Sequence, residues 1–246
     1  MRILAINGSP TPKEESITEL VLSQFLSGCC SAGATVEVAH LADKRIIPCD
    51  CGHLFVCWVK TPGRCIHHDE DQVYEILQQM ISADVIVLAT PLYLESMTGQ
   101  MKTLLDRTLP LVQPYIEASG DESRHPLRFL KEGVPFVLVS VCGHHEVSHF
   151  SALVHTIERV ARNLHGRLVG KILRPHAMLL RDGNRIGDQY HLIMNALSQA
   201  GEELVREGVV SSVTEKQIQA ELMPRDSFLL GANRLWRQAL ERREFR

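Results

Sequence analysis

Four cysteines are the residues of this chain whose type and spacing most directly suggest chemistry: Cys49, Cys51, Cys57 and Cys65. Four thiolates in one loop can hold a [4Fe–4S] cluster or a tetrahedral zinc ion, and they can equally stay free or redox-active. The single residue between Cys49 and Cys51 strains two ligands of one metal. Three nearby histidines could join a zinc site: His53, His67 and His68. These alternatives stay open at the level of the sequence.

The segment from Gly8 to Ser16 is a candidate anion site. It follows an apolar run and precedes a helix-period segment, so it places the hydroxyls of Ser9, Thr11 and Ser16 at a helix N-terminus. Backbone N–H groups without helical partners and the positive end of the helix dipole both favour a phosphate there. Taken alone, the pattern is also that of an ordinary helix cap.

A second polar loop, from Ala89 to Arg107, follows the third apolar run. In a doubly wound sheet, ligands bind beyond the carboxyl ends of the strands, and the loops after the first and third strands flank that crevice. The two loops together therefore predict one ligand site. Within the second loop, we expect Asp106 and Arg107 to form an ion pair that fixes the helix.

The elements that must position these loops follow from the hydrophobic pattern. Five apolar, β-rich runs lie at 3–6, 36–41, 85–89, 134–141 and about 168–173. Helix-period segments separate or follow them: one from Ile17, one capped by Asp69, one that begins at Ser96 or Thr98, and two at 148–164 and 187–208. Such alternation predicts an α/β fold with a parallel sheet covered by helices on both faces.

The chain continues beyond this predicted core. Thr214 and Gln217 have the spacing of a capping box and predict a short helix, and the tail from 226 to 246 combines an apolar stripe with five arginines after residue 233. We therefore divide the chain into a domain at 1–210 and a C-terminal helical extension at 211–246. An apolar stripe of this kind leads us to expect that the tail docks on a neighbouring subunit.

The composition is that of an ordinary globular protein, with 45% hydrophobic and 22% charged residues and a net charge of −3. These values exclude an intrinsically disordered chain and do not favour nucleic acid as a partner. No apolar run approaches the length of a bilayer, so we expect no membrane. Seven cysteines without an export signal lead us to expect a cytoplasmic location.

Several short motifs resemble the NADPH-dependent FMN reductase family: Asn7-Gly8-Ser9-Pro10, Thr90-Pro91-Leu92-Tyr93, Gly99-Gln100-Met101-Lys102 and Leu105-Asp106-Arg107. The resemblance covers about residues 1 to 110 by motif. It is nearest to the branch of iron–sulfur flavoproteins and multimeric flavodoxin-like reductases, which share a second set of motifs: Pro48-Cys49, Gly63-Arg64-Cys65, Asp69 and Asp71.

The resemblance implies a flavodoxin-like, doubly wound, five-stranded parallel sheet of order 2-1-3-4-5. It implies FMN with its phosphate in the Ser9 to Ser16 loop, its isoalloxazine against the Pro91 to Leu94 loop, and one edge closed by the loop after the fourth strand. The implied cofactor-binding residues are Ser9, Pro10, Thr11, Ser16, Ile17, Pro91, Leu92, Tyr93, Leu94, Cys142 and Gly143. By the same resemblance, Cys49, Cys51, Cys57 and Cys65 are the candidate ligands of a [4Fe–4S] cluster.

The implied activity is that of an FMN-dependent oxidoreductase. It takes hydride from NAD(P)H and passes electrons to a small-molecule or protein acceptor, and the family implies a homodimer or homotetramer. Because the flavin carries the chemistry, no catalytic side chain is expected. His144, His145 and His149 lie near the presumed flavin mouth, where a protonatable group could serve an acceptor, although a plain surface loop is equally consistent.

One departure from the family pattern concerns the phosphate loop. Glu14 and Glu15 stand where the family usually has Gly and Asn, and carboxylates beside a phosphate weaken its binding unless Lys13 or the backbone compensates. Two other functions stay open. One is an iron–sulfur flavoprotein that transfers single electrons through a cluster in the Cys49–Cys65 loop, and the other is a flavin-free, flavodoxin-like binding scaffold.

Overall fold

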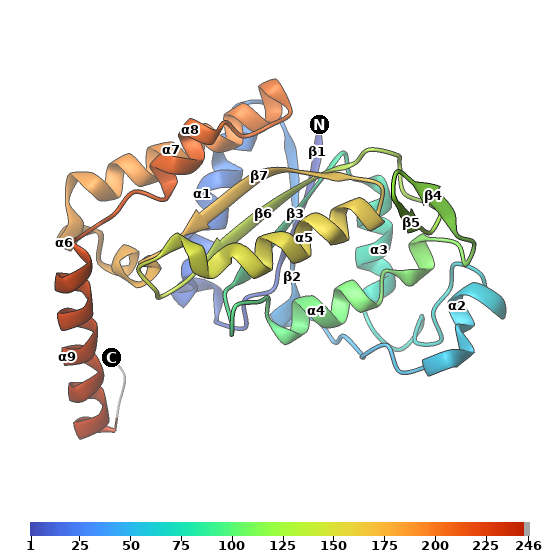
Figure 1. Cartoon of the computed structure of the whole chain (residues 1–246), viewed down its shortest axis with the longest axis horizontal. Coiled ribbons are helices and arrows are strands. Elements are labelled where there is room, and N and C mark those ends of the chain that lie inside the picture. The colour runs from blue at the N-terminus through green and yellow to red at the C-terminus, as the bar shows by residue number, and fades with distance from the viewer. Residues whose placement is uncertain (244–246) are drawn as a thin grey trace.

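A computed structural model of the chain describes residues 1–243 and, within them, every side chain except those at positions 53, 182, 184 and 185. Its centre is a five-stranded parallel sheet of order β2-β1-β3-β6-β7 (Figure 1). The strands are β1 (Arg2–Asn7), β2 (Thr35–His40), β3 (Val85–Pro91), β6 (Pro135–Val141) and β7 (Arg167–Arg174). Numbered within the sheet, this is the order 2-1-3-4-5, so the predicted fold is confirmed.

Helices cover both faces of the sheet because successive strand side chains point to opposite sides. Leu4 and Ile6 of β1 belong to one core cluster, and Ile3 and Ala5 belong to the other. The first cluster includes side chains of α3 (Val73–Ser82), α4 (Gly99–Asp106) and α5 (Ser151–Asn163). The second includes side chains of α1 (Ile17–Ser31), α7 (Asp188–Glu207) and α8 (Ser212–Ile218).

Short elements occupy the connections. The 3-10 helices are η1 (Lys13–Glu15), η2 (Leu41–Asp43), η3 (Gly52–Leu54), η4 (Leu109–Leu111), η5 (Val147–Phe150) and η6 (Ala177–Asp182). Two single-turn helices are α2 (Val56–Val59) and α6 (Gly183–Ile186). An antiparallel hairpin of β4 (Glu117–Ser119) and β5 (Glu122–Arg124) lies in the connection between η4 and β6. Figure 1 places α2 and this hairpin at one end of the molecule.

Two of the predicted helix caps are wrong, and one is confirmed. Asp71, not Asp69, accepts the Val73 backbone N–H at 3.1 Å, because Asp69 lies outside the turn and pairs with Arg64 instead. Ser211 caps α8 by accepting from the backbone N–H of Thr214, so Thr214 lies inside the first turn. Thr98 caps α4, as expected, by accepting the Met101 backbone N–H at 3.3 Å.

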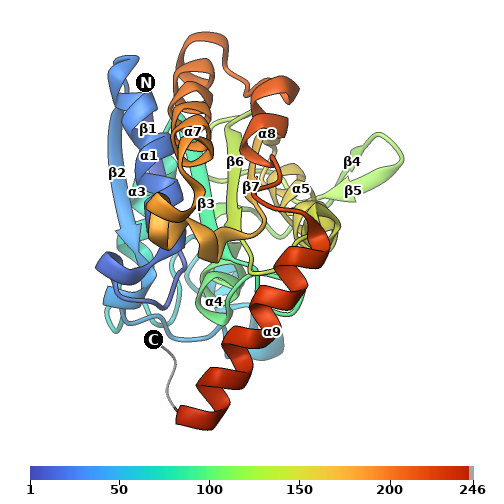
Figure 2. The same ribbon diagram turned by 90° about the vertical axis from the view of Figure 1, so that its left-hand side faces the viewer.

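None of the residues of the last helix, α9 (Arg225–Arg242), is buried. It stands at the end of the molecule opposite α2 (Figure 1), and Figure 2 shows the molecule from that end. By contrast, Ile218 of α8 and Leu222 after it belong to the second core cluster. The division of the chain at 210/211 therefore stays a proposal, and the part that leaves the core begins with α9.

The tightest packing lies between α1 and α7. A Cβ atom added at Gly28 would lie 1.9 Å from the carbonyl oxygen of Ser198, and one added at Gly201 would lie 2.1 Å from that of Phe25. Both contacts are with backbone, which a rotamer change cannot relieve. The two helices therefore approach as closely as they do only because both positions are glycine.

We expect Gly28→Ala to lower the free energy of unfolding by about 2 kcal/mol, because α1 must move away from α7. The matched control is Gly231→Ala in α9, where an added Cβ meets nothing within 4 Å. That change should leave stability equal or slightly higher, since alanine favours helix. Urea unfolding of the two variants measures both effects, and equal stabilities would contradict this account of the α1–α7 contact.

Candidate functional site

The loop between β1 and α1 is held by its own side chains. The Ser9 backbone N–H donates to Asn7 Oδ1 at 2.8 Å, and the Ser9 and Ser16 hydroxyls are hydrogen-bonded at 2.9 Å. Ser16 also caps α1 by accepting the Glu19 backbone N–H at 3.2 Å. The two hydroxyls are therefore fixed beside the N-terminus of α1, as the sequence predicts.

The loop after β3 is tied to the first loop. The Thr98 hydroxyl donates to the Gly8 carbonyl at 2.7 Å, and the Thr98 N–H donates to Thr90 Oγ1 at 3.1 Å. Tyr93 and Ser96 exchange two backbone hydrogen bonds, at 2.9 and 3.0 Å. Between them, Leu94 adopts a left-handed backbone with φ of +45° and its side chain is fully exposed. Such a conformation costs energy for a residue with a Cβ atom and is most often kept at functional loops.

These loops surround a crevice of about 190 Å³ at the carboxyl ends of the strands. It is lined by Ser9, Thr11, Glu15, Ser16, Ile17, Thr18, Pro91, Leu92, Tyr93, Val141, Cys142, Gly143, Ala177, Met178 and Arg181. The lining contains every cofactor-binding residue that the sequence suggested except Pro10 and Leu94. The structure thus brings residues of three loops, far apart in the sequence, to one place.

The crevice also contains residues that the sequence argument missed. Ala177, Met178 and Arg181 come from η6, which follows β7. The signal for them was available, because β7 is parallel to the other strands and its carboxyl end must point to the same edge of the sheet. The family resemblance pointed only to the loops after the first, third and fourth strands.

Arg181 changes the charge balance of the presumed phosphate end. Glu15 lines the crevice, and the Arg181 guanidinium donates to the Glu15 carbonyl at 3.2 Å. Lys13, the cation that the sequence offered, instead lies 4.0 Å from Glu19. Arg181, 166 residues further along the chain, therefore adds a positive charge beside Glu15.

The histidines near the crevice form two pairs. His144 stacks on His149 with ring centroids 4.1 Å apart, and Nδ1 of His149 lies 2.8 Å from Oε1 of Glu95. His145 packs against His176 at 4.0 Å, on the side where α9 begins. The first pair lies next to the loop after β3, because His149 contacts Glu95 of that loop. His144, His145 and His149, which are close in sequence, therefore belong to two separate pairs.

A buried guanidinium acts electrostatically on the second pair. Arg174, at the end of β7, is fully buried and donates to three carbonyl groups, those of Pro175, Ile218 and Ala220. Burial lowers the pKa of Arg174 to about 10. Burial, and then the neighbouring His145 and Arg174, lower the pKa of His176 to about 4. His176 is therefore a neutral imidazole at physiological pH.

The four clustered cysteines line one small cavity of about 10 Å³, together with Arg107. Burial first, and then the neighbouring thiols, raise the pKa of Cys57 to about 11, and the same two causes raise that of Cys49. Because all four side chains line one cavity, the loop brings the thiols close together. The cavity between them has room for about one water molecule, and Cys49 at its edge is exposed.

No group of three or more His, Cys, Asp or Glu side chains in the described part of the chain is arranged to hold a metal ion. His67, one candidate for a zinc site, has Nε2 2.6 Å from Oδ1 of Asp50, and His68 packs on Tyr74 at 3.9 Å. The side chain of His53 lies outside the described ones. The zinc alternative thus gains no support from the geometry.

A buried ion pair holds the cysteine loop in place. Nη1 of Arg107 lies 2.8 Å from Oδ2 of Asp71, and both side chains are almost wholly buried. The pair also binds the backbone of Ile47, since Arg107 donates to its carbonyl and Asp71 accepts its N–H at 2.9 Å. Burial opposes ionisation of Asp71, but hydrogen bonds from Arg107 and backbone N–H groups outweigh it, and its pKa lies below the ordinary value.

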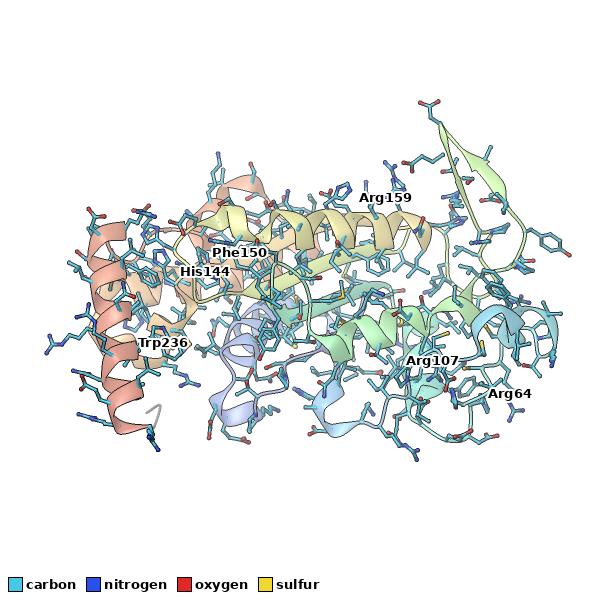
Figure 3. The ribbon with its side chains drawn as sticks, turned by 60° about the horizontal axis from the view of Figure 1, so that its bottom comes forward. Arg64, Arg107, His144, Phe150, Arg159 and Trp236 are labelled. Atoms are coloured by element: carbon cyan, nitrogen blue, oxygen red, sulfur yellow. The ribbon has the colours of Figure 1, made fainter. Side chains whose placement is uncertain are left out.

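The expected ion pair between Asp106 and Arg107 is therefore wrong. Adjacent residues on a helix point in different directions. Asp106 faces outward and pairs with Lys102 at 2.6 Å, one helical turn away, whereas Arg107 turns inward to Asp71. Figure 3 shows Arg107 at the end of the molecule opposite His144 and Trp236.

Comparison with known proteins gives a family match. The family described as NADPH-dependent FMN reductase matches residues 1–171. An iron–sulfur flavoprotein of Methanocaldococcus jannaschii is 38% identical over 112 residues, which cover 45% of this chain and 53% of that protein. One of Archaeoglobus fulgidus is 34% identical over 108 residues, covering 44% and 49%. The chain thus spans about half the length of the curated relatives it matches.

Solved structures share the fold at low identity. An FMN-dependent NADH-azoreductase from Bacillus anthracis, in complex with FMN, aligns with a TM-score of 0.62 and 17% identity over 83% of this chain and 99% of that one. An NAD(P)H:quinone oxidoreductase from Methanothermobacter marburgensis aligns with a TM-score of 0.58 and 16% identity over 83% and 96%. Within the described residues, no helix has the length and apolar character needed to cross a membrane.

The lowered pKa of His176 predicts an acid-sensitive stability. Its pKa of about 4 in the folded chain lies below the ordinary 6.5, so the unfolded chain binds the proton more tightly. The stabilisation is complete above pH 6.5 and is lost as the pH falls toward 4. We expect a loss of about 2–3 kcal/mol over this interval.

His176→Asn should remove this part of the pH dependence, because asparagine does not titrate and tolerates the left-handed backbone at φ +51°. His155→Asn, at an exposed position on α5, is the control and should keep the wild-type profile. Urea unfolding at several pH values tests this, and an unchanged slope in His176→Asn would refute the assignment.

Proposed function

We propose that this chain, which belongs to the NADPH-dependent FMN reductase family, binds FMN in the crevice and moves electrons from a reduced nicotinamide to a second substrate. The observation that carries the proposal is the convergence of three separate loops on one crevice, with nine residues expected from the resemblance among its lining. The seven cysteines are free thiols, which is consistent with a reducing cytoplasm as the place of action.

The crevice has a polar end and an apolar end, as FMN requires. At the polar end, the hydroxyls of Ser9 and Ser16 and the guanidinium of Arg181 would hold the phosphate. At the other end, the side chains of Pro91, Leu92 and Tyr93 offer apolar contacts for the isoalloxazine. Ser9 and Ser16 are almost fully buried, so their hydroxyls are positioned before any ligand binds.

When bound, FMN supplies the redox chemistry, because its ring accepts hydride from a reduced nicotinamide and passes electrons on. The chain's own residues bind and orient it. Tyr93 is half exposed, and Leu94 is fully exposed at the same rim, so a nicotinamide and an acceptor can reach the crevice from solvent. The acceptor is proposed only as a small molecule or a protein that takes electrons.

A single substitution tests this placement. An added Cβ at Gly143 meets nothing within 4 Å, and Gly143 lines the crevice, so Gly143→Leu should fold while filling the space for the ring. We expect it to weaken FMN binding at least about 100-fold and to abolish NADPH oxidation with an artificial acceptor. Gly99→Leu, also in open space but outside the lining, should bind FMN as the wild type does.

Fluorescence titration with FMN measures both variants, and circular dichroism confirms that they are folded. FMN binding that is equally strong in Gly143→Leu would contradict the proposed placement. Wild-type protein that takes up no FMN would contradict the proposed function itself and would favour the flavin-free binding scaffold.

A second candidate function is cluster-linked electron transfer. It is favoured by the convergence of Cys49, Cys51, Cys57 and Cys65 on one cavity and by the iron–sulfur flavoproteins among the curated relatives. The cationic Arg107 lines the same cavity, and its Nε has no hydrogen-bond partner. The Arg107 charge opposes the rise that burial and the neighbouring thiols cause in the pKa of Cys49, and to that extent it favours the thiolate, which is the form that binds iron.

This candidate predicts iron and acid-labile sulfide in equal amounts in anaerobically purified protein. Cys57→Ser and Cys65→Ser should each lose both, because a four-cysteine cluster does not tolerate the loss of a ligand. Cys30→Ser, at an exposed position outside the loop, is the control and should keep them. Wild-type protein without iron and sulfide, with all thiols titratable, would leave free or redox-active thiols as the function of the loop.

A further inference from the structure

A cavity larger than the crevice lies elsewhere in the molecule, between α4, α5 and the segment 108–125, which contains η4 and the β4–β5 hairpin. We call it the hairpin cavity. Its volume of about 490 Å³ is within the roughly 300–1,000 Å³ of pockets that enclose a small molecule. Among the described residues, none that lines the hairpin cavity also lines the crevice. The two are therefore separate sites.

The walls of the hairpin cavity are held in place without a ligand. Arg159 and Arg162 of α5 pair with Glu122 of the hairpin at 2.5 and 2.8 Å. Where the hairpin ends, Nε2 of His165 lies 2.9 Å from the carbonyl oxygen of His125. Figure 3 shows Arg159 on the part of α5 that lies toward the hairpin. A cavity whose walls are fixed in advance loses little conformational entropy when a ligand enters it.

The charges of the lining are already balanced. Three Lys and Arg side chains line the hairpin cavity, and each has a carboxylate partner at 2.5 to 3.0 Å: Lys102 pairs with Asp106, Arg124 with Glu117, and Arg159 with Glu122. An ionic ligand would lose its water and find every opposite charge in a pair, which costs free energy. The cavity therefore favours a neutral ligand.

The rest of the lining is largely apolar, and one side of it is aromatic. Met97 and Leu164 line the hairpin cavity and are buried. Toward the cysteine loop, the Trp58 ring packs on His125 with ring centroids 4.7 Å apart, and its Nε1–H donates to the Leu109 carbonyl at 2.8 Å. Both His125 and Leu109 line the cavity. Apolar and aromatic walls of this kind suit an aromatic ring.

His125 determines one hydrogen bond that such a ring can make. Its Nδ1 lies 2.8 Å from the carbonyl oxygen of Tyr115. Because a carbonyl group only accepts hydrogen bonds, Nδ1 carries the proton, and Nε2 of the neutral imidazole is then an acceptor. The complementary group on a neutral ligand is a hydroxyl that donates its proton to Nε2.

We propose that the hairpin cavity binds a small neutral phenol, that is, one or two aromatic rings with a hydroxyl group. The rings lie against the apolar wall, and the hydroxyl donates to Nε2 of His125. Asp106 and Leu109 line both this cavity and that of the four cysteines, so the bound phenol lies beside the cysteine loop. The site is separate from the crevice, and the proposal does not depend on FMN binding.

Calorimetric titration of the full-length protein with 2-naphthol, a neutral phenol, tests the proposal. We expect a dissociation constant on the order of 100 μM for this small ligand. The anion 2-naphthoate, which has the same two rings, should bind at least about tenfold more weakly, because the cations of the lining are already paired.

A variant that fills the hairpin cavity should lose this binding. Thr156 lines the cavity, and its hydroxyl donates to the Ala152 carbonyl of its own helix, so Thr156→Phe occupies the space without breaking a contact between elements. We expect it to bind 2-naphthol at least about tenfold more weakly and to bind FMN as the wild type does. His155→Phe, at the adjacent exposed position outside the lining, is the matched control and should bind both ligands normally.

Two further measurements locate the bound 2-naphthol. The Gly143→Leu protein, whose crevice is filled, should bind it as the wild type does. The chain has two tryptophans, so the indole N–H resonance that disappears in Trp58→Phe belongs to Trp58. Because this N–H donates to Leu109 in the wall of the hairpin cavity, 2-naphthol should shift the Trp58 resonance of the wild type and leave that of Trp236 unchanged.

Any of four results would overturn the proposal: a wild type that does not bind 2-naphthol, equal binding of 2-naphthoate, an unshifted Trp58 resonance, or loss of binding in Gly143→Leu, which would place the ligand in the crevice. A folded Thr156→Phe protein that binds 2-naphthol normally would also overturn it. If circular dichroism shows that this variant is unfolded, the Trp58 resonance of the wild type decides. A protein that binds 2-naphthol as expected but takes up no FMN would contradict only the proposed function.

Discussion

The parallel pairing of β1 with β3 and of β3 with β6 is the constraint on which the rest of the molecule depends. The register places Asn7 beside Ala89 and Pro91 beside Val141, so the three strands end at one edge of the sheet. The loops that follow these strands must therefore lie next to one another. The hydrogen bond from the Thr98 hydroxyl to the Gly8 carbonyl joins two of them. A crevice of mixed polarity at that edge is a consequence of topology, and the loop residues give it its chemistry.

Two buried arginines hold what lies outside the sheet. Arg107 fixes the cysteine loop through Asp71 and Ile47, and Arg174 fixes the segment after α8 through the carbonyls of Ile218 and Ala220. A buried guanidinium is costly unless its donors are satisfied, so these loops have little freedom to change their path. Arg107 thus connects the thiols at one end of the molecule to the core. Arg174 connects the segment that leads into α9 at the other end.

The sequence predicted the sheet and most of the crevice because both depend on local patterns: apolar strands, Thr98 as a cap, and hydroxyls at the start of α1. What it missed depends on long-range contacts. Arg181 donates a hydrogen bond to the carbonyl of Glu15, which is 166 residues away in the sequence. Arg107 forms its ion pair with Asp71 and not with the adjacent Asp106. The hairpin at 117–124 has strands of three residues, too short for a periodic signal. The convergence of the cysteines was foreseeable from their spacing, but the size of their cavity was not.

The central claim is that the crevice holds an FMN that a reduced nicotinamide can reach. The most direct measurement is an anaerobic titration of the FMN-loaded protein with NADPH, followed by flavin absorbance. The account predicts that the flavin bands bleach in proportion to the NADPH added and return when an electron acceptor is admitted. Flavin that stays bound and oxidised in the presence of both NADPH and NADH would contradict it.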